Sequence, residues 1–335
     1  MKYREDAEER PQATFDVVGI GNAIVDVISH ESDQFLKEFE LVKESMALID
    51  TELAVNIYEK MSSTSQSSGG SAANTMTGIT SLGGSAAYIG KVRKDSLGEF
   101  FIQDIHNAKV HYSLDPARNG LPTARSMIIV TPDGARTMNT YLGISTTLYK
   151  EDLDVEVLEN SKVLYCEGYI WDIEEGPALA KKAAEIARQN STTIAISLSD
   201  SFCVERHRES FKDFVRSEAN IVFADEDEIH SLFGTKNNEE MIEILSTLET
   251  LFAVTRAENG SIIINDKTII KQDATKVEKI IDTTGAGDAY ASGFLYGWTK
   301  DQTLSKCAEY GTYCATKIIQ QLGARIEKGL LNDLS

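Results

Sequence analysis

Residues 163–170 (VLYCEGYI) and 192–199 (TTIAISLS) are two apolar runs separated by the helix-compatible segment 176–189 (GPALAKKAAEIARQ). A strand, a helix and a second strand in this order indicate a parallel βαβ unit. The alternation continues with short strand-like runs at 220–224 (NIVFA) and 251–255 (LFAVT). We therefore expect an α/β fold with a doubly wound, mostly parallel sheet and helices on both of its faces.

The composition excludes several classes of protein. The chain has 335 residues, of which 33 are basic and 52 acidic, and its formal net charge is −19. A nucleic-acid-binding protein needs a basic footprint, and docking on an anionic membrane needs basic residues, so neither partner is expected. The four cysteines and five histidines show neither CxxC nor HExxH spacing, which argues against a zinc site.

The first twelve residues, MKYREDAEERPQ, carry mixed charge and read as a polar tail. They contain no apolar run, and no stretch of the chain reaches the ~18 apolar residues that span a bilayer. We therefore expect no targeting or membrane segment and a cytoplasmic location. The expected partners are small molecules, and the expected state is a monomer or homodimer.

The N-terminal half is less regular than the rest. Residues 15–29 read as a strand, a glycine turn and a second strand, and 46–49 form a short apolar run. The runs 126–130 and 137–141 flank TPDGAR, which predicts a hairpin. Residues 62–71 (SSTSQSSGGS), taken alone, look like a flexible linker. We expect a small β lid formed by residues 31–60 and 113–148, and a core formed by 15–30, 61–112 and 149–330.

The sharpest chemical motif is IDTTGAGDAY at Ile281–Tyr290. It joins a strand-like run at 276–281 to a small-residue helix at 285–299. Glycines at a helix entrance let backbone N–H groups point at an anion, and the helix dipole adds positive potential. Asp288 would sit in the first helical turn, where a carboxylate suits phosphoryl transfer if it receives the proton of an attacking hydroxyl. Helix capping alone explains one such residue, but not the whole Gly-Ala-Gly-Asp group.

Two other stretches suit a polyhydroxyl ligand. Gly69 and Gly70 permit close backbone approach, and Asn74 could bind hydroxyls from the first turn of a helix. The alternative is a linker followed by a helix start. Asp26 follows a Gly-x-Gly turn that lacks the third glycine of a dinucleotide fingerprint. Its carboxylate could accept two hydroxyl hydrogen bonds from a vicinal diol, or it could simply face water at the end of a strand.

Three weaker signals remain. Asp225 and Glu228 lie three residues apart after a strand-like run, and their carboxylates could hold Mg²⁺ through water. The same spacing is a capping box, which is the favoured interpretation of the pair taken alone. Arg136 begins the second strand of the hairpin and could reach a phosphate, although a solvated arginine is the simpler interpretation. Gly260 marks a turn after a strand.

Taken together, these motifs resemble the ribokinase-like (PfkB) carbohydrate kinase family over about residues 15 to 325. Two segments carry the resemblance. One is the Gly-Gly-x-x-x-Asn segment at 69–74, which continues to Gly90 and to 95–98. The other is 282–288 together with Tyr290. The resemblance implies the ribokinase-like fold, with a small β-sheet lid over the acceptor, and an ATP-dependent kinase activity.

The resemblance also implies roles for single residues. Asp288 would be the base that takes the proton of the acceptor hydroxyl. The Asn-x-x-Glu motif of the family falls on Asp225 to Glu228, so aspartate replaces asparagine, and Glu228 would hold Mg²⁺ through water. The other implied roles are an anion hole (Gly285, Ala286, Gly287), substrate binding (Asn22, Asp26, Gly69, Gly70, Asn74), ATP binding (Asp225, Glu228, Thr255, Gly260, with Ala257 replacing a glycine) and a monovalent-cation site for K⁺ (Asp282, Thr284).

Within the family, the chain is most similar to the bacterial adenosine-kinase-like branch. The segments that carry this likeness are Gly21-Asn22 ahead of Asp26, residues 136–143 and residues 198–204. The likeness implies that Asn22 faces a nucleobase and that Arg136 closes over the phosphates.

We therefore expect a Mg²⁺- and ATP-dependent kinase that phosphorylates the primary hydroxyl of a ribose-containing substrate. The expected reaction is transfer to the 5′-OH of adenosine, giving AMP. The alternatives are a free-sugar kinase of the ribokinase or fructokinase type, and a non-catalytic nucleotide-binding protein. A dinucleotide oxidoreductase is disfavoured because the third fingerprint glycine is missing.

Overall fold

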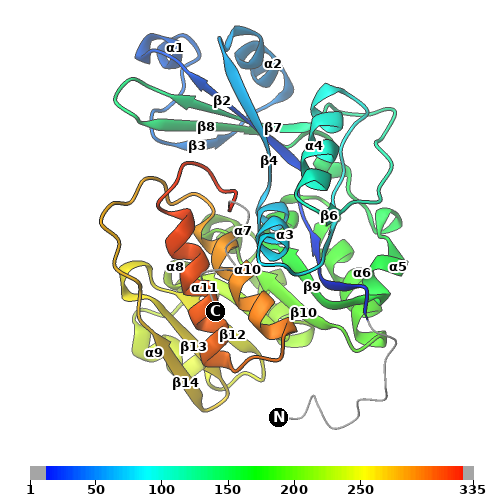
Figure 1. Cartoon of the computed structure of the whole chain (residues 1–335), viewed down its shortest axis with the longest axis vertical. Helices are drawn as coiled ribbons and strands as arrows, with labels where there is room; N and C mark the ends of the chain where they lie inside the picture. Colours follow the sequence, from blue (N-terminus) through cyan, green and yellow to red (C-terminus); the bar gives the residue numbers. More distant parts are fainter. Residues whose placement is uncertain (1–12, 327–335) are drawn as a thin grey trace.

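A nine-stranded sheet forms the body of the protein in the computed structural model, which describes residues 13–326 (Figure 1). Its strand order is β14-β13-β12-β11-β10-β9-β1-β5-β6, and every pair from β6 to β12 is parallel. The predicted doubly wound α/β fold is confirmed. The strands are β1 (Phe15–Ile20), β5 (Ala86–Ile89), β6 (Val110–His111), β9 (Ser161–Glu167), β10 (Thr193–Ser197), β11 (Ile221–Asp225), β12 (Leu251–Thr255), β13 (Ser261–Asn265) and β14 (Thr268–Gln272).

Helices cover both faces of this sheet because successive strand side chains point to opposite sides. Val17 of β1 belongs to one buried apolar cluster, and its neighbour Val18 belongs to the other. The first cluster is covered by α3 (Ser71–Ser81), α4 (Ser96–Asn107), α10 (Ala286–Thr299) and α11 (Leu304–Ile318). The second is covered by α5 (Val155–Glu159), α6 (Gly176–Gln189), α7 (Ser201–Ser217), α8 (Glu226–Phe233) and α9 (Asn238–Leu245).

One predicted strand of the body is absent. Residues 276–281, which looked strand-like, form no strand in the structure. The sheet ends at β14, and residues 276–281 do not pair with that strand. Instead the N–H of Ile281 donates to the carbonyl of Ile319, just after α11, at 2.8 Å. The segment therefore crosses the end of α11 on its way to α10.

A five-stranded sheet lies above the body (Figure 1), in the order β3-β8-β7-β2-β4. The predicted hairpin is confirmed, because β7 and β8 pair in antiparallel fashion from Arg125 opposite Tyr141 to Val130 opposite Arg136. The strands are β2 (Ile24–His30), β3 (Met46–Leu48), β4 (Thr64–Gly69), β7 (Ala124–Val130) and β8 (Arg136–Tyr141).

Two expectations about this region are wrong. The segment 62–71 is no linker, because residues 64–69 form β4, which pairs with β2 along six residues. The expected core segments 15–30 and 61–112 also contain β2 and β4, and both strands belong to the small sheet. The serine-rich sequence of β4 suits an edge strand, since only Ser68 and Gly69 are buried in it.

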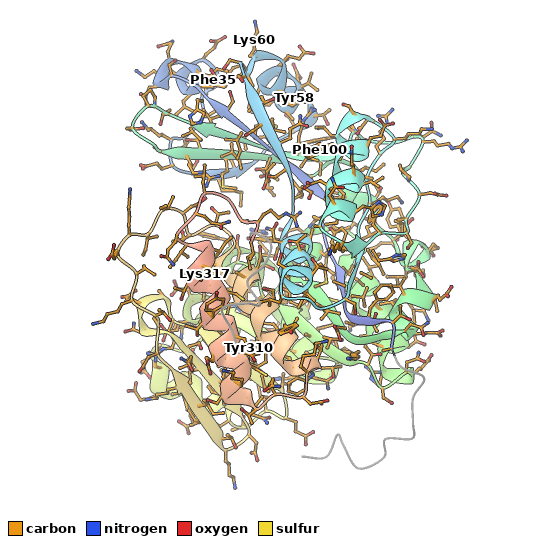
Figure 2. The ribbon with its side chains drawn as sticks, viewed as in Figure 1. Phe35, Tyr58, Lys60, Phe100, Tyr310 and Lys317 are labelled. Atoms are coloured by element: carbon orange, nitrogen blue, oxygen red, sulfur yellow. The ribbon has the colours of Figure 1, made fainter. Side chains whose placement is uncertain are left out.

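The two faces of the small sheet have different surroundings. Helices α1 (Asp33–Glu38) and α2 (Thr51–Lys60) cover the outer face, where Phe35 and Tyr58 pack (Figure 2). The guanidinium of Arg125 lies over the ring of Tyr58, with 4.9 Å between its central carbon and the ring centroid. The inner face is turned toward the body, so the small sheet covers the space between itself and the body.

Parts of two expectations fall outside the described residues. These are the polar tail at 1–12 and the last four residues, 327–330, of the expected core. Within residues 13–326, no helix combines the length and apolar character needed to cross a membrane.

Helices α10 and α11 pack so closely at Gly293 that no larger residue fits there without moving them apart. A Cβ at Gly293 would lie 2.3 Å from the carbonyl oxygen of Tyr310. We expect Gly293→Ala to lower the free energy of unfolding by roughly 1–3 kcal/mol through overpacking, although alanine has the better helix propensity by about 1 kcal/mol. Denaturant unfolding of parent and variant measures whether the free energy of unfolding falls or rises. A variant as stable as the parent would show that the two helices separate without cost.

Candidate active site

A cavity of about 1700 Å³ lies between the body and the small sheet. Four of its lining residues are the last residues of neighbouring parallel strands: Glu167 of β9, Ser197 of β10, Asp225 of β11 and Thr255 of β12. Ligands of doubly wound sheets bind outside the carboxyl ends of the strands, because the loops diverge there. The cavity therefore has the position expected of an active site in this fold.

The loop before α10 forms one wall of the cavity. Gly285 caps the helix with φ +78°, and no side chain caps it. Among residues 13–326, the N–H groups of Gly287 and Asp288 have no hydrogen-bond acceptor, whereas the N–H of Ala286 donates to Thr283 at 3.1 Å. A Cβ at Gly287 would meet open space. The loop thus offers free amides to an anion, but the expected contribution of the Ala286 amide is already used in a turn.

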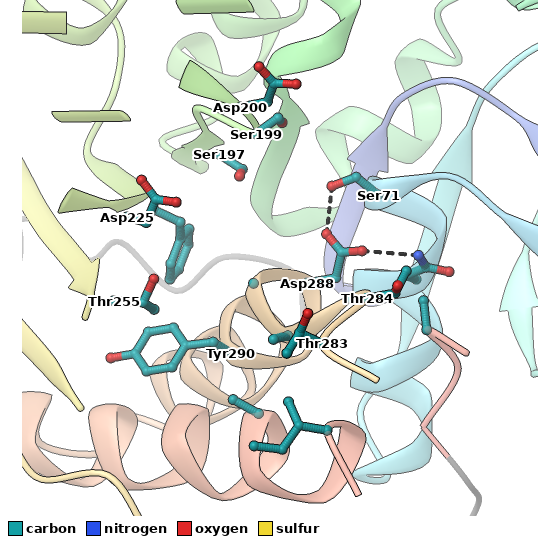
Figure 3. Close-up of a pocket in the computed structure, with 18 of the residues that line it drawn as sticks. Ser71, Ser197, Ser199, Asp200, Asp225, Thr255, Thr283, Thr284, Asp288 and Tyr290 are labelled. Atoms are coloured by element: carbon teal, nitrogen blue, oxygen red, sulfur yellow. Dashed lines mark hydrogen bonds between the residues drawn. The ribbon is translucent and has the colours of Figure 1, made fainter. Parts of the chain in front are cut away.

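Asp288 lies in the first turn of α10, beside the N-terminus of α3 (Figure 3). One carboxylate oxygen accepts from the Ser71 hydroxyl at 2.6 Å, and the other accepts from Asn74 Nδ2 at 3.0 Å. Burial raises the pKa of Asp288, while the two hydrogen bonds and the charge of Arg325 lower it. A carboxylate that is held in place and raised in pKa has the properties of a general base.

Asp26 faces the cavity from the small sheet. Among residues 13–326, no group donates a hydrogen bond to its carboxylate. Burial raises its pKa to about 6. Gly69, opposite Ile24 in the sheet, leaves room for it, because a Cβ there would lie 2.7 Å from Oδ2 of Asp26. The two carboxylate oxygens are free to accept hydroxyl groups of a ligand.

The remaining predicted acceptor-binding residues lie nearby. Gly70 and Asn74 line the same cavity as Asp26, and Oδ1 of Asn74 is buried without a partner. Gly70 takes φ +95°, and a Cβ there would lie 2.1 Å from the carbonyl oxygen of Asn22. Asn22 also lines the cavity, and its Oδ1 is likewise buried without a partner. The structure therefore brings four of the five predicted acceptor residues to the cavity wall, whereas Gly69 does not line the cavity and packs against Asp26.

Asp225 and Glu228 form the capping box of α8. Each carboxylate accepts the backbone N–H of the other residue, at 2.8 and 3.0 Å. The capping interpretation is correct, yet both residues also line the cavity, as does Asp200. Burial and the nearby Asp225 raise the pKa of Glu228 to about 8. Each carboxylate keeps one oxygen outside the box, and oxygen ligands of this kind suit Mg²⁺ held through water.

Thr255 and Gly260 bound a short turn at the cavity wall. Ala257, which stands where the family has glycine, takes φ +46°. Alanine in this left-handed region costs backbone strain, so the turn has the shape that glycine would favour. Gly260 takes φ +79°, and a Cβ there would lie 2.0 Å from the carbonyl oxygen of Gln272.

The expected cation site at Asp282 and Thr284 is occupied by protein donors. The Asp282 carboxylate accepts from the N–H and hydroxyl of Thr284, from the N–H of Gly323 and from the Arg136 guanidinium, with which it forms an ion pair. A monovalent cation beside this carboxylate would have to displace Arg136. The structure therefore does not support the K⁺ expectation in this conformation. It shows Arg136 joining the lid to the anion loop.

Two further residues at the site had no sequence motif to reveal them. Arg325 follows α11, and its buried guanidinium donates to the carbonyls of Ser68 and Ala73 and to the Thr77 hydroxyl, at 2.6–2.9 Å. Glu167 ends β9, is 1% exposed and has its pKa raised to about 7 by burial. For Glu167, the signal in the sequence is a glutamate that directly follows the apolar run at residues 163–166.

Comparison with known proteins agrees with this geometry. Residues 40–328 match the model of the pfkB family of carbohydrate kinases. The chain belongs to this family. It is 43% identical to an adenosine kinase from Sinorhizobium meliloti, with 96% of this chain and 98% of that chain covered and a TM-score of 0.88. It is 44% identical to a probable sugar kinase from Rhizobium etli CFN 42, with 95% and 97% covered and a TM-score of 0.87.

A curated relative, adenosine kinase 2 of Arabidopsis thaliana, is 24% identical over 92% of this chain and 94% of its own length. Membership of the family makes the protein a phosphotransferase with an alcohol group as acceptor. ATP is the phosphoryl donor that a kinase of this family uses.

The raised pKa of Glu228 gives a pH test of the site. Its pKa is about 8 in the folded protein and close to the ordinary value of roughly 4.3 when unfolded. The folded state therefore binds the extra proton between these values, so Glu228 contributes stability below pH 4 that is lost as the pH rises through about 8. We expect the stability of the parent relative to Glu228→Gln to fall between pH 5 and pH 9. Denaturant unfolding at both pH values measures it, and an unchanged or growing difference would contradict the assignment.

Proposed function

We propose that this kinase transfers the γ-phosphate of ATP to the 5′-hydroxyl of adenosine, giving AMP. The observation that carries the proposal is the composition of one end of the cavity. A carboxylate without a protein partner, Asp26, lies on the same inner sheet face as an apolar wall. A ribose diol suits the carboxylate, and a purine ring suits the wall, so a nucleoside uses both at once.

The apolar wall comes from the small sheet and the residue that follows it. Met46 and Leu48 of β3 line the cavity while 50% and 54% exposed, so together they present an uncovered apolar surface to it. Tyr169 lines the same cavity from the body. A free sugar has no large apolar face and would leave these side chains against water. The other apolar lining residues of the lid are Ile24, Met138 and Leu142.

The positions of the polar residues suggest how the hydroxyl reacts. Asp26 and Asn74 would hold the ribose so that its 5′-hydroxyl reaches Asp288, which takes the proton as the oxygen attacks the γ-phosphorus. The free amides of Gly287 and Asp288 would accept the negative charge that develops on the transferred group. Positioning and electrostatics therefore supply the rate, and the lid excludes water.

The donor end of the cavity has residues for ATP and for Mg²⁺. Thr255 and Gly260 line it, and the oxygens of Asp225 and Glu228 outside the capping box would hold Mg²⁺ through water. A divalent ion there would neutralise charge on the phosphates. Arg136, now paired with Asp282, stands close enough to the anion loop to exchange that carboxylate for a phosphate when ATP binds.

The relatives support this reading to different degrees. The adenosine kinase from Sinorhizobium meliloti supports a nucleoside acceptor. The probable sugar kinase from Rhizobium etli, at almost the same identity, makes a free-sugar kinase the second candidate. The apolar lid wall is what favours the nucleoside.

Asp288 provides the test of the mechanism. We expect Asp288→Asn to lower kcat by roughly 10²- to 10⁴-fold, the usual contribution of a general base. The variant should melt at a temperature no lower than the parent, because burial disfavours the ionised carboxylate that it replaces. ADP release and thermal melting measure the two effects. Full activity of the variant would refute the assigned base.

An acceptor panel tests the substrate. We expect ADP release from MgATP with adenosine, weaker release with inosine and guanosine, and little with ribose or fructose. Leu48→Ser should raise the KM for adenosine several-fold, by roughly the 1–2 kcal/mol of a buried apolar contact, and should leave any turnover of ribose unchanged.

Val42→Ser is the matched control, because Val42 is an exposed apolar residue of the lid region that does not line the cavity. It should leave the KM for adenosine unchanged. Turnover of a free sugar alone would overturn the nucleoside assignment while keeping the kinase.

A further inference from the structure

Glu167 is the buried carboxylate of the cavity that the mechanism above does not use. It accepts three hydrogen bonds, all from two short segments of chain. Oε1 accepts from the backbone N–H of Asn22 at 2.7 Å and from Nδ2 of Asn22 at 3.0 Å. Oε2 accepts from the backbone N–H of Ala72 at 2.7 Å. A fully buried carboxylate that accepts this many N–H groups holds the donor segments in place strongly and specifically.

The two segments are two of the four connections, or hinges, between the body and the lid; the other two join β6 to β7 and β8 to β9. Asn22 lies between β1 of the large sheet and β2 of the small sheet, and Ala72 lies two residues after the chain returns from β4 through Gly70. The segments touch each other, since the carbonyl oxygen of Asn22 would be 2.1 Å from a Cβ at Gly70. Glu167 therefore fastens both of these connections to the end of the same body strand.

The contact at Ala72 also affects the position of Asp288. Helix α3 has Gly70 as its N-cap and no side-chain cap, so the Glu167 carboxylate supplies the missing cap from another element. The first turn of the same helix carries Ser71 and Asn74, the two donors to Asp288. The position of Asp288 thus depends on a helix end that Glu167 holds.

The contact at Asn22 sets what that side chain presents to a ligand. Because Nδ2 of Asn22 donates to Glu167, the other amide atom, Oδ1, is left buried and without a partner in the wall of the cavity. An ionised Glu167 requires this orientation, since an oxygen turned toward it would be repelled. Asn22 therefore offers an acceptor, which recognises an N–H or O–H group of the substrate.

We propose that Glu167 is a positioning residue that holds two of the four lid hinges, those at Asn22 and Ala72, orients Asn22 as a hydrogen-bond acceptor for the substrate and holds the α3 donors against Asp288. The inference rests on the proposed function only in taking Asp288 as the base. Close packing around the carboxylate supports it, because a Cβ at Gly21 would lie 2.2 Å from Oε2.

Glu167→Gln tests the proposal with almost no change of shape. Glutamine keeps one acceptor oxygen but turns an NH₂ group toward one of the donors, so one hinge loses its contact. We expect the acceptor KM to rise roughly ten- to a hundredfold, the usual cost of losing a hydrogen bond to a charged group, and kcat to fall with it. The KM for ATP should stay within about twofold, since Glu167 bonds to acceptor-side residues only.

Hydrogen exchange of the ligand-free protein gives a second readout that needs no substrate. Peptides that cover residues 20–24 and 70–74 should exchange faster in Glu167→Gln than in the parent. The result is independent of which acceptor is the true one, so failure of the adenosine assignment and failure of this proposal can be told apart. The kinetic readout uses whichever acceptor the panel identifies.

Asp16→Asn is the matched control. Asp16 is a carboxylate 5% exposed near the other end of β1, paired with Lys162 and Lys300, and it does not line the cavity. It should lower thermal stability while leaving both KM values and the exchange of 70–74 unchanged. If Glu167→Gln does not fold, Glu167→Asp, which keeps the charge but is one methylene shorter, should show the same pattern to a smaller degree.

A loss of kcat in Glu167→Gln with both KM values unchanged would overturn the proposal, because a merely structural residue lowers only the amount of active enzyme. Unchanged exchange at both of these hinges, Asn22 and Ala72, would overturn it as well.

Discussion

The hydrogen bonds from Ser71 and Asn74 to Asp288 join two helix N-termini, and the rest of the site depends on that junction. The partners are more than 210 residues apart in the chain. They meet because α3 and α10 both begin at the same edge of the large sheet, where the parallel strands end. Helix N-termini carry positive partial charge, so two of them stabilise a carboxylate and an incoming phosphate together.

The junction gathers negative charge that the fold must tolerate. Asp26, Glu167, Glu228 and Asp288 all line the cavity, and burial raises the pKa of each. Such groups cost stability, and natural proteins keep costs of this kind at functional sites. The repulsion between the site and an anionic phosphate donor is limited in three ways. Burial shifts the carboxylates toward their neutral form, free amides line the anion loop, and Arg136 stands beside that loop. The net charge of −19 matters less, because distant charges are screened within about 8 Å.

The sequence predicted what depends on local pattern. The alternation of strands and helices after residue 150 was enough for the parallel sheet, and the small-residue helix at 285–299 was found because its glycines and Asp288 are adjacent in the chain. The sequence did not predict that β4 belongs to the small sheet, because its serine-rich stretch has no apolar period. Its pairing with β2 is a long-range contact that the local pattern does not encode. Residues 276–281 have strand propensity, but they cross the end of α11 and pair with no strand among the residues that the structure describes.

Glu167 and Arg325 were missed for a related reason. Each acts on residues far away in the chain, and a single charged residue carries no periodic or spacing signal. Their importance appears only when their burial and partners are known. Candidate binding residues such as Asp26 were easier, because the glycines beside them are themselves a sequence signal of close approach.

The residues proposed for phosphoryl transfer and those proposed for acceptor choice lie in different parts of the protein, so relatives with different names can be equally similar to this chain. The body carries the anion loop, Asp288, the acidic pair of α8 and the turn at Ala257, and the roles proposed for them would serve phosphoryl transfer to any alcohol. The lid carries Met46 and Leu48, which line the cavity from the small sheet. Overall identity of 43–44% to an adenosine kinase and to a probable sugar kinase does not separate the two acceptors. Under the proposed function, the apolar character of a few lid side chains therefore carries more weight for the acceptor than identity over the whole chain does.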